Sequence, residues 1–456
     1  MLVMIDGQKC GYAVNQRVEK DGMVHTSEEV FMSINRLGVT MDVTEKTSYI
    51  ETAAGEPVSF ETVQKFSGAE PQITRGKIKD GKLTLIRSGE PQSIADYDPQ
   101  ALMPEGLRLA VLKDGIKPGS TLSFTVFDAA LVQNMPARLE VAEKERIDLF
   151  GRIKELYKVV TTTTIPGAGD VRMTSYVDDD YKPYKSSTWL MGLTIEMAAC
   201  EKAVALSPNS PADLFANLLI VSPVNIPQAA LSSPITYTLE ITKPSDDVNV
   251  PSDDNQRAAK DDGGNIVVRV APVADVRGEP MPVEHKEPQL ADSLASNGYI
   301  QSDNAKIKAL AKKAVADAAD SLTAVHNIEE FVHGYITSKN LSAGYATALE
   351  VLESKEGDCT EHAILTAAMC RSIGIPAKVA CGVVYAEAFS GRGDIFGGHA
   401  WTLCYIGGKW VGLDATIGRN GYNSGHIKLA EGDGRPEDFF SLINLLGNFK
   451  ITKIEF

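Results

Sequence analysis

The segment of the sequence best suited to chemistry is Gly357-Asp358-Cys359-Thr360-Glu361. Asp358 followed three residues later by Glu361, just before an apolar run, is the capping-box signature of a helix N-terminus. We therefore expect Cys359 in the first turn of a helix that ends near Ile373, before a glycine and a proline. Unpaired backbone N–H groups at that position stabilise a thiolate, and they can also stabilise an oxyanion. The pattern predicts that Cys359 attacks a carbonyl carbon.

A nucleophilic cysteine needs a base, and the base needs an orienting group. His399 and Asp414 lie downstream, on either side of Gly407-Gly408, which is a two-residue hairpin signal. If Ile406 opposes Lys409, then His399 and Asp414 are diagonal neighbours on one face of the hairpin, about 7–8 Å apart at Cα. A register slip of one residue would send them to opposite faces. The predicted hairpin therefore permits a histidine–carboxylate pair.

Two helices are expected before the cysteine. Lys306–Ala324 is rich in alanine and keeps its larger apolar residues on one face, and Asn327–Ile336 has a second apolar stripe. The stripe of the second helix consists of Ile328, Phe331, Val332 and Tyr335. We interpret this stripe as core packing without a chemical role.

The first half of the chain is rich in predicted strands. Residues 1 to about 240 contain alternating runs such as Thr121–Phe127, and Asp80-Gly81 marks a hairpin. A weak internal echo links Thr47–Glu51, with Pro57 after it, to Thr174–Asp178, with Pro183 after it. The echo leaves open whether this half is one domain or two subdomains that meet near residue 115.

The domain boundary is predicted at residues 272–288, a proline-rich segment. The chain is then multidomain, with a β-rich N-terminal region at 1–271 and a second domain at 289–456. The polar segment Lys243–Asn265 is interpreted as an exposed loop between two paired strands, because β-type runs flank it. Its aspartates lack the ligand spacing of an EF-hand loop.

Composition excludes several classes of partner. The 456 residues carry 45 Lys plus Arg and 60 Asp plus Glu, a net charge of −15 that disfavours nucleic acid and anionic membrane surfaces. No apolar run is long enough to span a bilayer. Met1–Ile5, followed by Asp6, lacks the features of a signal peptide, so any signal sequence is expected to be absent from this chain.

The remaining candidates have simpler interpretations. Five of the six cysteines lie in apolar or alternating runs and fit small buried hydrophobes; they are Cys10, Cys200, Cys370, Cys381 and Cys404. His362 forms Cys-x-x-His with Cys359, but two further ligands at matching spacing are missing, so neither a metal nor a cofactor is expected. Trp401 is either sheet core or, because it adjoins His399, part of a substrate cleft.

From about Leu290 to its end the chain resembles the transglutaminase-like superfamily of papain-type cysteine enzymes. The resemblance rests on an ordered set of motifs: GDC at 357–359, IGIPA at 373–377, HAW at 399–401, LDAT at 413–416 and HIKL at 426–429. It implies an α+β fold with a cysteine-bearing helix packed on an antiparallel sheet. It also implies a triad of Cys359 as nucleophile, His399 as general base and acid, and Asp414 as its orienter.

The sequence departs from the family pattern at three points. Asp-Ala-Thr replaces the Asp-Pro-Thr of many bacterial relatives, and Thr402 stands where they often carry an acidic residue. Between Asn340 and Gly357 there is no Gln or Trp to serve as the upstream oxyanion donor. Tyr345 is the candidate for that role, and an ordinary core or rim position is its alternative.

The resulting hypothesis is a thiol-dependent acyl-transfer enzyme acting on a peptide or protein substrate. Attack by water makes it a peptidase or amidase, which we favour because the sequence has no sign of an amine channel or a calcium switch. Attack by an amine makes it a protein-glutamine transglutaminase. A catalytically inactive binding module is the alternative from another class. The large β-rich region and the acidic surface favour an extracytoplasmic, periplasmic protein of a bacterium.

Overall fold

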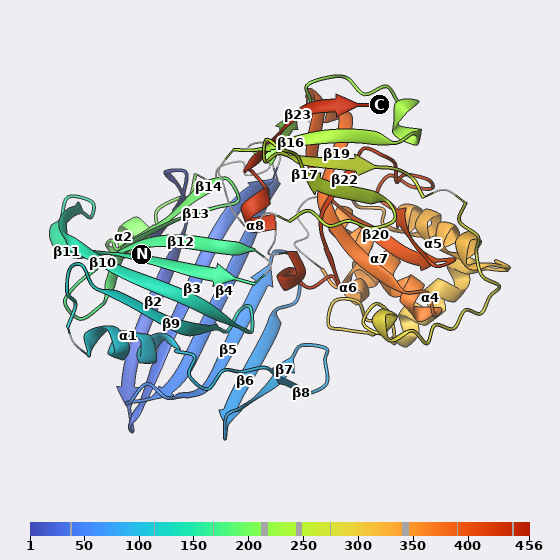
Figure 1. Ribbon diagram of the computed structural model, residues 1–456. Coiled ribbons are helices and arrows are strands. Elements are labelled where there is room, and N and C mark those ends of the chain that lie inside the picture. The colour runs from blue at the N-terminus through green and yellow to red at the C-terminus, as the bar shows by residue number, and fades with distance from the viewer. Residues whose placement is uncertain are drawn as a thin grey trace. The chain divides into compact units, whose positions relative to one another are not determined.

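The computed structural model describes residues 1–456 apart from 37–38, 114, 167, 211–217, 243–248, 274, 340–345, 390 and 440–441. The chain divides into two compact units, Met1–Leu214 and Phe215–Phe456 (Figure 1). The candidate triad lies in the second unit. Tyr345, the candidate oxyanion donor, lies outside the described residues.

The first unit is built on one antiparallel sheet of 14 strands. The order of its strands is β8-β7-β6-β5-β4-β3-β2-β1-β14-β13-β12-β11-β10-β9. Their bounds are β1 (Leu2–Ile5), β2 (Gln8–Lys20), β3 (Met23–Arg36), β4 (Val39–Thr52), β5 (Pro57–Phe66), β6 (Gln72–Lys79), β7 (Lys82–Arg87), β8 (Ser93–Ala95), β9 (Thr121–Asp128), β10 (Gln133–Asp148), β11 (Ile153–Ile165), β12 (Gly169–Val177), β13 (Pro183–Leu190) and β14 (Leu193–Ala198). Helices α1 (Pro104–Leu112) and α2 (Lys202–Ala205) complete the unit. Strand β1 pairs with both β2 and β14 and so joins the two halves of the sheet.

Both segments of the internal echo lie on strands that pair with the next strand in the chain. Glu51 on β4 pairs with Pro57 on β5, and Val177 on β12 pairs with Pro183 on β13. The register of pairing shifts just before Glu51 in the first pair of strands and just before Val177 in the second. The two halves separate in sequence between β8 and β9, on either side of residue 115, but they form one continuous sheet. The predicted hairpin at Asp80-Gly81 is confirmed by the pairing of β6 with β7.

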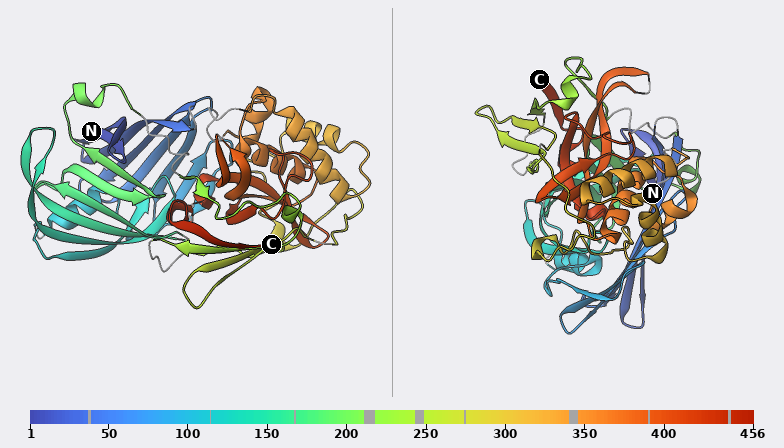
Figure 2. Two further views of the ribbon diagram at one scale, coloured as in Figure 1. Left: turned by 90° about the horizontal axis from the view of Figure 1, so that it is seen from above. Right: turned by 90° about the vertical axis from the view of Figure 1, so that its right-hand side faces the viewer.

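The second unit contains two sheets and a group of helices. One sheet has the order β15-β20-β19-β22, with β21 paired to β20, and the other has the order β17-β18-β16-β23. The strands are β15 (Ile220–Val221), β16 (Ile235–Ile241), β17 (Gln256–Lys260), β18 (Ile266–Val270), β19 (Ala377–Phe389), β20 (Arg392–Ile406), β21 (Lys409–Leu413), β22 (His426–Gly432) and β23 (Phe449–Glu455). The helices are α4 (Ala305–Val315), α5 (Ser321–Tyr335), α6 (Ala348–Ser354), α7 (Cys359–Ser372), α8 (Leu442–Leu445) and three short 3₁₀ turns, Ala230–Ser232, Pro288–Leu290 and Pro436–Phe439. Figure 2 shows α4–α7 gathered on one side of this unit and β16–β18 on another.

The boundary between the units differs from the predicted one at 272–288. Strand β16 pairs with β18 on one side and with β23, the last strand, on the other. These pairings bind residues 235–270 to the second unit, which begins at Phe215. The expected pairing of the strands that flank Lys243–Asn265 is confirmed, but this segment also contains β17, which pairs with β18.

The first helix is shorter than predicted. The sequence suggested one helix over Lys306–Ala324, whereas α4 ends at Val315 and Ala316 has a positive φ of 48°. Asp320 then caps α5, because its side chain accepts a hydrogen bond from the backbone N–H of Thr323. A capping aspartate competes for the backbone and starts a new helix where the apolar pattern alone would continue the old one.

Strands β19 and β20 contribute to two hydrophobic cores. Ala377, Val379 and Cys404 pack with the side chains of α4–α7, whereas Val383 and Phe396 pack with the second sheet. The sheet that contains β19 and β20 therefore packs against the helices on one side and against the second sheet on the other. This packing fixes the position of β20, the strand that carries His399. Among the described residues no helix is long and apolar enough to cross a membrane.

Candidate active site

The cysteine-bearing helix begins as the sequence predicts. Helix α7 starts at Cys359, with Asp358 as its N-cap and a complete capping box between Asp358 and Glu361. The glycine before them is needed for space as well as conformation. Gly357 has a φ of +156°, and a Cβ atom there would lie 2.3 Å from the Cβ of Glu361. The half-buried Cys359 therefore lies in the first turn, at the positive end of the helix, where Asp358 caps the backbone N–H groups of the two residues after Cys359.

Glu361 anchors the segment that leads into the helix. Its side chain is fully buried, and its carboxylate accepts the backbone N–H groups of Asp358 at 2.8 Å and Ala346 at 3.0 Å. Burial, together with the charge of Asp358, raises the pKa of Glu361 well above its ordinary value. The carboxyl group thus joins the turn before Cys359 to the chain leading into α6.

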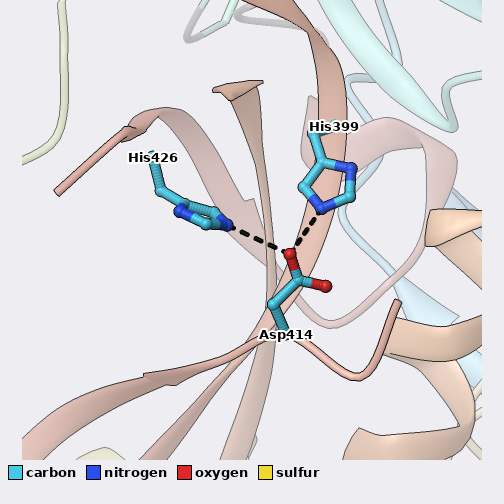
Figure 3. A group of neighbouring side chains, drawn as sticks. All are labelled: His399, Asp414 and His426. Carbon is cyan, nitrogen blue, oxygen red and sulfur yellow. Dashed lines mark hydrogen bonds and ion pairs between the residues drawn. The ribbon is translucent and has the colours of Figure 1, made fainter. Parts of the chain in front are cut away.

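The predicted hairpin register is confirmed. Ile406 pairs with Lys409, and the same register continues to Thr402 and Leu413. Beyond the last pair, the Nε2 atom of His399 lies 2.8 Å from the Oδ2 atom of Asp414 (Figure 3). The hairpin therefore brings the two side chains into the hydrogen bond that its register permits.

His399 and Asp414 each favour the charged form of the other. Burial disfavours a charged His399 ring, but the Asp414 carboxylate and the neighbouring Cys359 sulfur outweigh it and raise the pKa of His399 to about 10. Burial likewise disfavours a charged Asp414, but His399 and His426 outweigh it and hold the pKa of Asp414 well below its usual range. At neutral pH the pair is therefore an imidazolium hydrogen-bonded to a carboxylate.

A second histidine binds the same carboxylate oxygen. The Nε2 atom of His426, on β22, lies 3.1 Å from Oδ2 of Asp414, and His426 is fully buried (Figure 3). Among the described residues, His399, Asp414 and His426 form a group whose possible metal-ligating atoms all lie within 4.8 Å of one another. The two hydrogen bonds are sufficient to explain this approach. His426 is the first residue of the HIKL motif at 426–429, but we assigned it no role in the site from the sequence alone.

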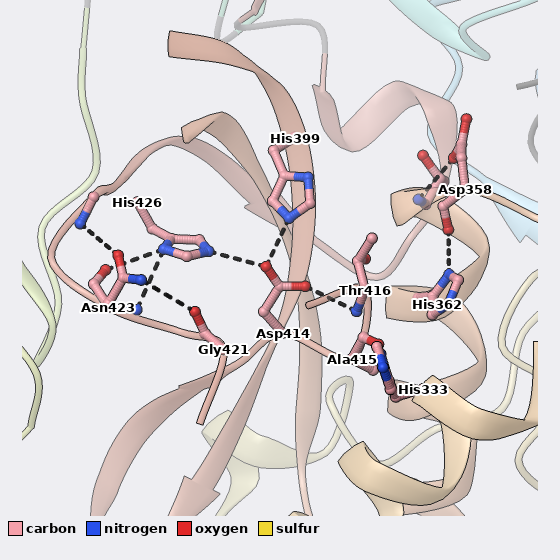
Figure 4. Close-up of polar contacts among 12 residues, drawn as sticks. His333, Asp358, His362, His399, Asp414, Ala415, Thr416, Gly421, Asn423 and His426 are labelled. Carbon is pink, nitrogen blue, oxygen red and sulfur yellow. Dashed lines mark hydrogen bonds and ion pairs between the residues drawn. The ribbon is translucent and has the colours of Figure 1, made fainter. Parts of the chain in front are cut away.

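Helix α5 holds the backbone around Asp414 (Figure 4). Glu329 is fully buried, and its Oε1 atom accepts the backbone N–H of Asp414 at 2.8 Å. His333 lies one turn further along the helix, with Nδ1 at 3.0 Å from the carbonyl oxygen of Ala415. The backbone N–H of Thr416 donates to Oδ1 of Asp414 at 3.0 Å. The carboxylate is thus oriented by contacts at both of its oxygens and at its own backbone.

Replacing Glu329 by alanine is expected to lower both stability and reactivity at the site. The buried N–H of Asp414 would lose its acceptor, which costs about 1–3 kcal/mol of unfolding free energy. Asp414 would also lose its fixed position, so the reaction of Cys359 with a thiol reagent near neutral pH should slow. Urea unfolding and alkylation rates measure the two effects. Glu330→Ala is the matched control, because Glu330 is exposed and its ion pair within the described part of the chain is with Arg419. Equal behaviour of the two variants would contradict the anchoring role.

The other candidates occupy less reactive positions. Trp401 is 1% exposed and packs against Tyr422 and His426, so it is a core residue rather than the wall of a cleft. His362 is buried, and its Nδ1 atom donates to the carbonyl oxygen of Asp358 at 2.6 Å. Its Nε2 atom has no hydrogen-bond partner among the described residues. All six cysteines are free, and Cys10, Cys370 and Cys404 are buried.

The comparison with protein families agrees with the motifs. Residues 308–415 match the family model described as the transglutaminase-like superfamily. The C-terminal part of the chain therefore carries a transglutaminase-like domain, of a family of thiol-dependent enzymes, behind a large β-rich N-terminal region. The matched range contains Cys359, His399 and Asp414. No curated protein matches the chain.

Several solved structures resemble parts of the chain. A "putative cysteine protease" from Cytophaga hutchinsonii is 21% identical over 49% of this chain and 84% of its own, with a TM-score of 0.31. The periplasmic domain of TgpA from Pseudomonas aeruginosa, bound to ethylmercury, is 14% identical over 44% of this chain and 88% of its own, with a TM-score of 0.28. A β-barrel-like protein of the DUF1849 domain from Brucella abortus is 14% identical over 41% of this chain and 85% of its own, with a TM-score of 0.34.

Proposed function

We propose that the second unit is a cysteine-dependent amidase or peptidase in which Cys359, His399 and Asp414 act as a triad. The observation that carries the proposal is the 2.8 Å hydrogen bond between His399 and Asp414, and the Cys359 sulfur is close enough to help raise the pKa of the same imidazole. A nucleophile at a helix N-terminus, a base beside it and a carboxylate that orients the base are the parts that covalent acyl transfer requires.

The reaction proceeds in two steps. The Cys359 thiolate attacks the carbonyl carbon of a carboxamide or peptide, and the backbone N–H of Cys359 itself, at the start of α7, stabilises the oxyanion. The His399 imidazolium gives its proton to the leaving amine, the C–N bond breaks, and a thioester to Cys359 remains. Water then attacks the thioester while His399 takes the proton, which releases the acid and restores the thiolate–imidazolium pair.

The same thioester can react with an amine instead of water, and then the protein is a transglutaminase. We favour water because no feature of the described residues marks a path for an amine. The deciding experiment incubates the protein with a fluorescent alkylamine and a glutamine-containing acceptor protein. We expect ammonia or new amino termini without covalent label, and neither product from Cys359→Ala. Covalent label that depends on Cys359 would overturn the preference for hydrolysis.

An inactive binding module is the remaining alternative. It predicts that Cys359 reacts with iodoacetamide no faster than an ordinary thiol, which ionises with a pKa of ~8.5. Fast alkylation at pH 6 would exclude it. We also propose that the enzyme is extracytoplasmic, and the large β-rich region supports this location.

A further inference from the structure

Resting on the proposed function, we propose that His426 is a positioning residue of the triad. Its Nε2–H group holds the Oδ2 atom of Asp414, the same oxygen that His399 binds, and so limits how strongly Asp414 attracts the proton of His399. His426 comes from β22, a strand that pairs with β19 and not with the hairpin that carries His399. The inference goes beyond a three-residue triad, because it assigns a fourth side chain to the control of its acid–base balance.

The contacts of His426 fix which ring nitrogen carries the proton. An ionised carboxylate only accepts hydrogen bonds, so the 3.1 Å contact with Asp414 requires a proton on Nε2. The Nδ1 atom can then accept the backbone N–H of Asn423, which lies 3.3 Å away. The carbonyl oxygen of Asn423, 3.1 Å from Nδ1, already receives the backbone N–H of His426 itself. A ring with its proton on Nε2 therefore donates to Asp414 and accepts the backbone N–H of Asn423.

The surroundings of His426 keep it neutral. Burial lowers the pKa of His426, and the adjacent His399 charge acts in the same direction, although Asp414 and the backbone carbonyl of Asn423 oppose both. Tyr422 and Trp401 pack on the ring, with centroids 4.8 Å and 5.2 Å away. The other titratable groups that face the His399–Asp414 pair are Cys359 and His362 on α7, and Glu329 and His333 on α5.

A neutral donor on Oδ2 has two consequences for His399. It withdraws negative charge from the oxygen that binds His399, so the imidazolium gives up its proton more easily to a leaving amine. It also stops the carboxylate from rotating, because Oδ2 has two fixed donors and Oδ1 has the backbone N–H of Thr416. Without His426, His399 should hold its proton to higher pH and the site should be less well aligned.

The test uses the full chain with ¹³C- and ¹⁵N-labelled histidine, whose seven rings are followed by NMR. In the wild-type protein the nitrogen shifts of His426 should identify a neutral Nε2–H ring at pH 7 and above. In His426→Phe the titration midpoint of His399 should rise by about half to one pH unit, since the variant removes one hydrogen bond to a charged acceptor. The rate of acyl transfer at pH 7 should fall by about tenfold, because His399 then gives up its proton to the leaving amine less easily.

Two variants separate this role from packing. Glutamine can donate an amide N–H to Asp414, so His426→Gln should restore the His399 midpoint and most of the rate of acyl transfer. Ser424→Ala is the matched control, because Ser424 is buried two residues away and its hydroxyl has no partner among the described residues. It should leave both measurements unchanged.

The outcomes also separate this inference from the proposed function. A slow, ordinary Cys359 in the wild-type protein contradicts the proposed function. A fast Cys359 in the wild type, with an unchanged His399 midpoint in His426→Phe, contradicts the role of His426 alone. If His426→Phe does not fold, the wild-type spectrum decides, because a proton on Nδ1 of His426 would overturn the inference.

Discussion

Replacing Asp414 by asparagine should remove the alkaline half of the pH range in which the site is active. The carboxylate is the main attraction that raises the pKa of His399 to about 10, against the effect of burial. A neutral amide leaves burial unopposed by that charge, so the His399 pKa should fall to its ordinary value of 6.5 or below. The proton donor for the leaving amine is then missing at pH 7 to 9, and turnover should fall by about 10²- to 10⁴-fold.

The measurement is the rate of acyl transfer against pH in the wild type and in Asp414→Asn. The descending limb of the wild-type profile should lie near the His399 pKa of about 10, and the limb of the variant should move toward more acidic pH. Asp394→Asn is the control, because Asp394 lies on the same strand as His399 but bonds to Tyr385 and Asn225. A variant that loses rate equally at every pH would show that Asp414 does not act through the protonation of His399.

Iodoacetamide at pH 6 should label Cys359 and no buried thiol. Cys359 is half-buried at a helix N-terminus beside a histidine that is protonated at that pH, so its thiolate is stabilised. Three other thiols are held in the protonated form, since burial raises the pKa of Cys10 to about 11 and the pKa values of Cys381 and Cys404 well above the ordinary value. The expected selectivity is at least about 100-fold.

Peptide mapping by mass spectrometry after timed alkylation tests this selectivity. Cys359→Ala should remove both the rapid labelling and all acyl transfer, whereas Cys381→Ser should preserve both. Cys381 is the matched comparison because it lies close enough to Cys359 to feel its charge. Rapid labelling of Cys381 in the wild type, or activity that survives Cys359→Ala, would contradict the assignment of the nucleophile.

The sequence predicted the parts of the site that depend on local rules. The capping box that starts α7 and the Gly407-Gly408 turn are each set by residues a few positions apart, and both agree with the structure. The approach of His399 to Asp414 followed from the hairpin register, because a two-residue turn leaves little freedom in the pairing. The catalytic roles of these residues stay predictions.

Local rules of this kind do not predict contacts between segments that are far apart in the sequence. Glu329 lies in the helix that we interpreted as core packing, and the interpretation holds for Ile328 and Val332, which are fully buried. Glu329 points instead to the backbone of Asp414, 85 residues later, and no local spacing encodes that contact. His426 reaches Asp414 from a strand on the other side of β19 for the same reason. The pairing of β16 with β23 likewise joins residues more than 200 positions apart.

The central position of β1 has a consequence for biosynthesis. Strand β1 leaves the ribosome before β14, at Leu193–Ala198, and until β14 has emerged one edge of β1 has no strand to pair with. A nascent polypeptide that ends before β9 therefore exposes a bare strand edge, which readily recruits strands from other molecules. The half-translated protein, more than the finished one, is the species that needs protection by chaperones.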